Sequence, residues 1–66
     1  MASYALNVFI DRKSEIDELL SRMIAASEDH FSVHPDAVTW AHVGSLTEIA
    51  RQLRTTMAFM AGDDID

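Results

Sequence analysis

The stretch that decides the fold runs from residue 14 to residue 27 and reads SEIDELLSRMIAAS. Its apolar side chains recur at spacings of three and four residues, which is the pattern of an amphipathic α-helix with one apolar face. Ser14 is expected to cap this helix, with Asp17 three residues later in place of the Glu of a capping box. Asp11 is a rival cap one turn earlier. The apolar face comprises Ile16, Leu19, Leu20, Met23 and Ile24.

A second amphipathic pattern covers residues 45–61. The sequence Ser45-Leu46-Thr47-Glu48 has the spacing of a capping box, so it predicts that this helix begins at Ser45. Gly62 lies where a residue with positive φ commonly ends a helix. The apolar face of this predicted helix comprises Leu46, Ile49, Ala50, Leu53, Met57 and Met60.

The connection between the two patterns, residues 31–43, contains a further helix signal. His34-Pro35-Asp36 is typical of a helix entrance, because proline is tolerated in the first turn. A short helix ending at Gly44 is therefore predicted here, with little or no break before the helix that follows. Phe31, Val33 and Trp40 are expected to fasten the connection to the core.

The N-terminal segment, residues 1–10, has two interpretations. Tyr4, Leu6, Val8 and Ile10 alternate as in a β-strand. The segment also fits the helical period through Ala2, Leu6, Phe9 and Ile10, and it could then extend the first helix backward. A lone strand cannot satisfy its own backbone groups, so the helix is favoured.

Together these patterns predict one all-α domain over residues 1–66, with an acidic tail at residues 62–66. The two long helices are expected to form an antiparallel helical hairpin with a short helix in the connection. The chain has 66 residues and no cysteine, so a second copy is the expected source of additional stability. A homodimer that builds a four-helix-type bundle is predicted, with apolar contacts from Ile16, Leu20, Met23, Trp40, Leu46, Leu53, Met57 and Met60.

No residue pattern in the sequence indicates catalysis. His30, His34 and His42 have carboxylates nearby, but they do not form an H-E-x-x-H motif, and Pro35 separates the first two. There is no G-x-S-x-G elbow, no cysteine nucleophile and no glycine-rich phosphate loop among only two glycines. We therefore predict a protein that is not an enzyme and that uses no metal and no cofactor.

The charge of the chain favours a protein partner. Eleven acidic and five basic residues give a net charge of −6. This charge opposes direct binding to nucleic acid and to an anionic membrane, and it favours a partner with a basic groove. Neither a secretory signal nor a membrane span is evident, so a cytoplasmic location is expected. The predicted partner-binding acidic surface comprises Glu15, Asp17, Glu18, Glu28, Asp29 and Asp36.

Residues 34–46 read HPDAVTWAHVGSL and resemble short uncharacterised open reading frames of bacterial mobile elements with an HPD–W–VG–L pattern. In size and charge the chain is similar to small acidic accessory proteins of phages and plasmids, including anti-CRISPR and anti-restriction inhibitors. That similarity implies an inhibitor that binds a basic, nucleic-acid-handling protein. The residues leave two alternatives open: a homodimerisation or adaptor module that binds through its apolar helix faces, and a His/carboxylate metal-binding protein.

Overall fold

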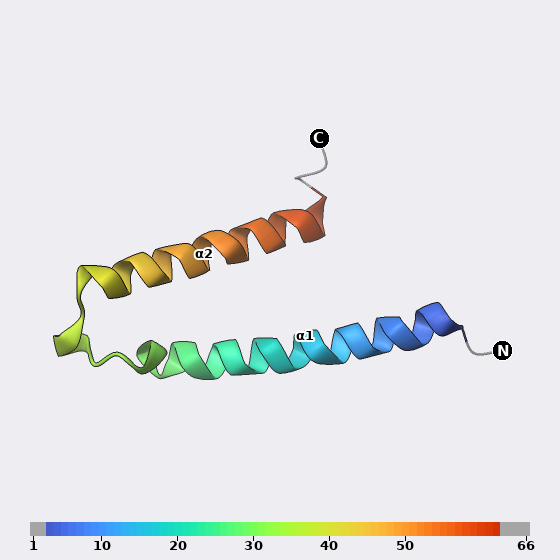
Figure 1. Ribbon diagram of the computed structural model, residues 1–66, viewed down its shortest axis with the longest axis horizontal. Coiled ribbons are helices and arrows are strands. Elements are labelled where there is room, and N and C mark those ends of the chain that lie inside the picture. Colours follow the sequence, from blue (N-terminus) through green and yellow to red (C-terminus); the bar gives the residue numbers. More distant parts are fainter. Residues whose placement is uncertain (1–2, 63–66) are drawn as a thin grey trace. The chain divides into compact units, whose positions relative to one another are not determined.

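The computed structural model describes residues 3–62, and every regular element within them is a helix (Figure 1). The order is α1 (Tyr4–Glu28), η1 (His30–Ser32), η2 (Pro35–Ala37) and α2 (Trp40–Ala61), where η denotes a 3-10 helix. The predicted all-α class is therefore confirmed. Internal contacts divide the chain into two units, Met1–Val33 around α1 and His34–Asp66 around α2, and each unit is described by itself. The antiparallel pairing of the helices, the single domain and the dimer stay predictions.

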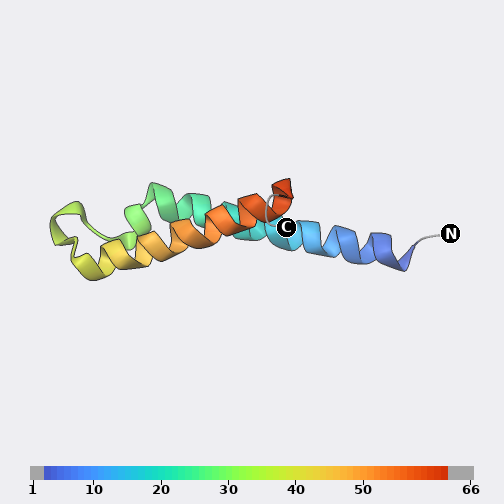
Figure 2. The ribbon, with the colours of Figure 1, turned by 90° about the horizontal axis from the view of Figure 1, so that it is seen from above.

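Helix α1 begins about three turns earlier than its most regular apolar stretch suggests. The Oγ of Ser3 accepts a hydrogen bond from the backbone N–H of Leu6 at 3.3 Å and caps the helix. The predicted caps Ser14 and Asp11 are therefore wrong, because both lie inside a helix that is continuous in two views (Figure 1 and Figure 2). No glycine or proline precedes residue 14, so nothing interrupts the helical period. The helical interpretation of residues 4–10 is confirmed, and Ala2 lies outside the described residues.

Helix α2 begins at Trp40, so the predicted start at Ser45 is wrong. Its cap is Thr39, whose backbone N–H donates to Nδ1 of His42 at 3.0 Å. The backbone N–H of His42 donates in return to the Thr39 Oγ1 at 3.4 Å. This is a reciprocal capping box in which His42 takes the position that Glu or Gln usually occupies.

Gly44 was predicted to end a short helix, and the structure differs at this residue. Gly44 does not end a short helix, because α2 runs through it without a break. An added Cβ at Gly44 would have no neighbour within 4 Å, so neither the backbone nor the packing of this unit requires glycine there. At the other end, Gly62 terminates α2 with a φ of 82°, as predicted, and its N–H donates to the Phe59 carbonyl at 3.1 Å.

The connection contains the predicted helix entrance at His34-Pro35-Asp36. The Asp36 backbone N–H donates to Nδ1 of His34 at 3.1 Å, and the resulting 3-10 helix η2 ends at Ala37. Val38 and Thr39 then adopt extended backbone angles, so η2 is separate from α2.

A left-handed turn without glycine follows α1. His30, Phe31 and Ser32 have φ values of 55°, 54° and 62°, and this region costs a residue with a side chain about 1–2 kcal/mol. Asp29 holds the turn, because its carbonyl accepts from the Ser32 N–H at 3.0 Å and its carboxylate accepts from the Ser32 hydroxyl at 3.3 Å. The turn ends the first helix sharply.

Neither unit has a buried core: within residues 3–62, no side chain is buried. Phe31 and Val33, which were expected to fasten the connection, are half-buried. Trp40 was expected to do the same, but it is 86% exposed at the start of α2. Within its own unit Trp40 has few neighbours, because it occupies the first position of the helix, and its contact with a core stays a prediction. In the described part of the chain, neither long helix meets the length and hydropathy of a membrane span.

The capping box at the start of α2 can be tested with Thr39→Ala. Loss of the Thr39 hydroxyl is expected to destabilise the first turn by about 1 kcal/mol. Amide hydrogen exchange of residues 40–43 should therefore become faster. Thr55→Ala is the matched control, since the Thr55 hydroxyl only donates back to the Arg51 carbonyl inside the helix. Equal exchange rates in Thr39→Ala and the unmodified chain would contradict the cap.

Candidate interaction surface

Helix α2 carries apolar residues in a heptad repeat along one face. Its residues follow one another at alternating spacings of three and four positions, as in the seam of a coiled coil. The exposed fraction rises from 40% at Leu53, in the middle of the helix, to 73% at Met60, near its end. The residues that we call the α2 seam are Val43, Leu46, Ala50, Leu53, Met57 and Met60.

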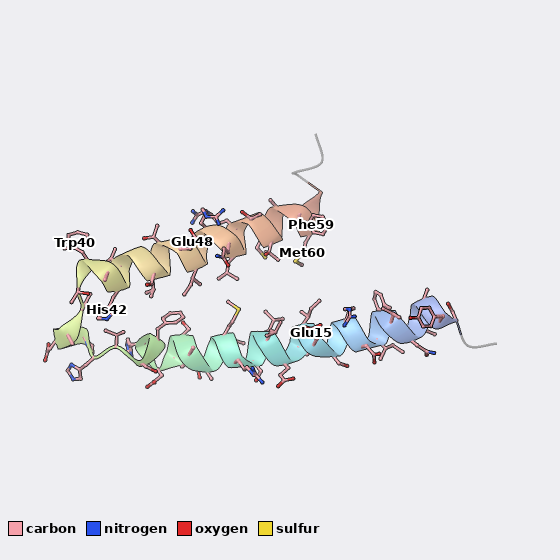
Figure 3. The ribbon with its side chains drawn as sticks, viewed as in Figure 1. Glu15, Trp40, His42, Glu48, Phe59 and Met60 are labelled. Atoms are coloured by element: carbon pink, nitrogen blue, oxygen red, sulfur yellow. The ribbon has the colours of Figure 1, made fainter. Side chains whose placement is uncertain are left out.

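Trp40 does not belong to the α2 seam. Figure 3 shows its side chain and that of Met60 on opposite sides of the helix. The other four residues predicted as contacts in this half of the chain all lie on the seam, namely Leu46, Leu53, Met57 and Met60. These four residues therefore share one face of α2 and Trp40 does not, and the contacts of all five stay predictions.

Helix α1 carries a second apolar face, which is less regular. Arg12 and Lys13 interrupt it between Phe9 and Ile16. Phe9 is 68% exposed, and the residues further along are about half exposed, except Met23, which is half-buried. The residues that we call the α1 seam are Phe9, Ile16, Leu19, Leu20 and Met23. Three of them, Ile16, Leu20 and Met23, were predicted as contacts from the sequence.

Three of the predicted partner-binding acids form ion pairs within α1. Asp17 accepts from Lys13 at 2.7 Å, and Glu18 accepts from Arg22 at 2.7 Å. Glu15 accepts from Arg12 at 3.4 Å, the longest of the three contacts. Exposed pairs of this kind stabilise a helix by only about 0.3–0.5 kcal/mol each. In each pair, however, a basic side chain of α1 neutralises a carboxylate that was predicted to bind a partner protein.

The other predicted acids do not join them in one cluster. Glu28 ends α1, and Asp29 accepts the Ser32 hydroxyl in the left-handed turn. Asp36 belongs to η2 in the other unit. Its carboxylate lies 3.8 Å from Nδ1 of His34, but that nitrogen already accepts the Asp36 N–H and so carries no proton. We therefore do not count this contact as an ion pair.

The net charge is concentrated outside the long helices. Residues 4–28 contain five acidic and three basic side chains, and residues 40–61 contain one acidic and two basic side chains. Asp63, Asp64 and Asp66 supply three of the six net negative charges, and they lie outside the described residues. The acidic character of the chain is thus not a property of one helix face.

Glu48 is the acceptor in the tightest charged cluster of α2 (Figure 3). Its carboxylate accepts from Arg51 at 2.6 and 3.0 Å and from the Gln52 amide at 2.8 Å. The hydrogen bonds from Arg51 and then Gln52 lower the pKa of Glu48 from 4.5 to about 2. The same contact with Glu48 raises the pKa of Arg51. Glu48 is engaged here and has no part in capping the helix.

Arg54 follows Leu53 directly and therefore borders the α2 seam. The residues three and four positions away on either side are Ala50, Arg51, Met57 and Ala58. None of them is a carboxylate, so the regular spacing of α2 offers Arg54 no ion pair. This arginine is a cation beside an exposed apolar face.

The Glu48 cluster gives a testable pH dependence. Because the pKa is depressed, the ionised Glu48 stabilises α2 above pH 4.5, and this contribution is lost as the pH falls toward 2. A carboxyl titration followed by NMR should place the pKa of Glu48 well below its ordinary value of 4.5. Arg51→Gln should raise its pKa most, and Gln52→Ala should raise it less. An ordinary Glu48 titration in the unmodified chain would contradict the cluster.

Two of the three histidines, His34 and His42, make local contacts with the backbone through their imidazole rings. Nδ1 of His34 and Nδ1 of His42 each accept a backbone N–H, at 3.1 and 3.0 Å. Across residues 3–62, no three His, Asp or Glu side chains come together as a metal site would require. These two histidines therefore help to shape the connection and the start of α2.

Comparison with known proteins gives no match: no family model, no curated protein and no solved structure is significantly similar to this chain.

Proposed function

We propose that this chain is a small helical protein-interaction module that binds through the apolar seams of α1 and α2. One observation carries the proposal: the α2 seam is exposed along a helix of 22 residues. Isolated helices are marginal in water unless an apolar face packs against something. A regular apolar heptad on such a helix is the usual binding face of a helical partner.

The second candidate is an inhibitor that presents an acidic surface to a basic, nucleic-acid-handling protein. The net charge of −6 favours this candidate. The ion pairs of Glu15, Asp17 and Glu18 weaken it, since a basic partner would have to compete with Arg12, Lys13 and Arg22. Within its own unit, no side chain of either apolar seam is buried, so the seams are the stronger candidate surface.

Two matched variants separate these candidates in an affinity capture from the native host. One variant removes charge from α1 by Glu15→Gln, Asp17→Asn and Glu18→Gln. The other removes apolar volume from the α2 seam by Leu46→Ala and Met57→Ala. We expect the seam variant to lose the captured protein, whether that protein is another copy or a different chain, and the charge variant to retain it.

Salt provides an independent readout of the same binding. The Debye length falls from about 30 Å at 0.01 M salt to about 3 Å at 1 M salt, so an acidic surface would release its partner. Binding through the seams should persist at high salt. Release by salt together with loss in the charge variant would refute the proposed function in favour of the acidic surface.

A further inference from the structure

We propose that the left-handed turn after α1 is a conformational switch: in a second state, α1 continues through Val33 as a right-handed helix. The turn comprises His30, Phe31 and Ser32, which all have positive φ. Every residue that changes conformation belongs to the unit around α1. The switch goes beyond the proposed function, because it concerns the chain alone and needs no partner on the seams.

The left-handed turn is strained, and its backbone hydrogen bonds have equivalents in a helix. Its three residues carry side chains at positive φ, which costs more than their low helix propensity would. The N–H of Ser32 donates to the Asp29 carbonyl at 3.0 Å, and the N–H of Val33 donates to the His30 carbonyl at 3.1 Å. In a longer α1 both N–H groups would meet carbonyls four residues back. Extension therefore gives up the Ser32 hydroxyl bond to Asp29 and the half-buried position of Phe31, and it relieves the strain.

Helix α1 ends at a place that is unfavourable for a helix. Its last residue is Glu28 and its C-cap is Asp29, so two carboxylates lie at the negative end of the helix dipole, where no basic side chain balances them. An extension of about one turn moves this end past both carboxylates. Pro35 limits the extension, because proline disfavours helical backbone at the preceding His34, whose ψ is already 137°. The switch is therefore confined to residues 30–33.

The sequence of the turn also fits the apolar face of α1. Phe31 follows Leu20 by eleven residues and Ile24 by seven, which correspond to about three and two turns of an α-helix. In an extended α1 these three side chains would share one side. Leu20 and Ile24 are 50% and 59% exposed, so this side is open within its unit. A helical partner that contacts Phe31 on this side would favour the extended state and shift the population toward it.

A matched pair of substitutions at His30 tests the switch in the full-length chain. His30→Ala keeps a Cβ, which opposes positive φ, and alanine is the best helix former. His30→Gly removes the steric cost of positive φ and disfavours the helix. We expect the ratio of the extended state to the turn state to be about tenfold higher with alanine than with glycine. The imidazole is absent from both variants, so its loss does not cause the difference.

NMR relaxation dispersion and saturation transfer measure a minor state that exchanges within microseconds to milliseconds. The unmodified chain should show exchange at residues 29–33, which increases with His30→Ala and decreases with His30→Gly. The minor state should have the chemical shifts of a right-handed helix at Phe31. A second variant, Ser32→Ala, removes the hydroxyl bond to Asp29 and should also raise the extended population.

Three results would overturn the switch. Minor-state shifts of a disordered segment would show that the end of α1 frays and does not extend. Equal populations in the alanine and glycine variants would show that positive φ at residue 30 does not control the exchange. Absence of exchange in all of the chains would show that the left-handed turn is a fixed end of α1. None of these results bears on the proposed function, because the measurements involve no partner.

Discussion

Leu53→Asp is expected to abolish self-association at concentrations where the unmodified chain is paired. Leu53 lies in the middle of the α2 seam, and burying a leucine is worth about 1.5–3 kcal/mol. An unpaired carboxylate in an apolar interface adds a further penalty of several kcal/mol. The combined loss, more than about 3 kcal/mol, weakens association by more than a hundredfold. Size-exclusion chromatography with light scattering should show a monomer.

Thr55→Asp is the matched control for this substitution. It introduces the same charge into the same helix two positions away and outside the seam, and it leaves the helix propensity nearly unchanged, because threonine and aspartate have similar propensities. The control should therefore remain associated. Equal dissociation of both variants would show that the added charge controls association, and the seam would lose its support.

Dilution of the unmodified chain is expected to cause a large loss of helix. Neither described unit has a buried core, so the order of α1 and α2 should depend on the partner that covers their seams. For a dimer that unfolds as it dissociates, each tenfold dilution lowers the apparent stability by about 1.4 kcal/mol. Circular dichroism during thermal unfolding should show a midpoint that falls with concentration. An unfolding midpoint that is independent of concentration would exclude this coupling.

The sequence predicted the helices and their apolar faces well, because the three- and four-residue spacing is a strong signal. It predicted the starts of both helices poorly. Ser45 and Glu48 have the ideal spacing of a capping box, but Glu48 is engaged by Arg51 and Gln52. The true cap, Thr39 with His42, uses an imidazole where the motif normally has a carboxylate or amide, so the pattern did not indicate it.

The sequence did not indicate the left-handed turn, and its net charge overstated the acidic surface; the two errors have different reasons. His30, Phe31 and Ser32 are ordinary residue types, and a turn with positive φ is usually signalled by glycine. The ion pairs of Glu15, Asp17 and Glu18, in contrast, follow spacings of three and four residues that the sequence displays openly. Net charge counts every carboxylate equally and does not show which carboxylates are paired within their own helix.

The solution mass of the unmodified chain, measured by sedimentation equilibrium together with its helical content, tests the central idea most directly. The chain mass is 7.4 kDa, and covered seams predict twice this mass for the helical form at both low and high salt. Dissociation to the single-chain mass should coincide with loss of helix. A fully helical species of 7.4 kDa that persists on dilution would contradict the idea that a second copy covers these helices.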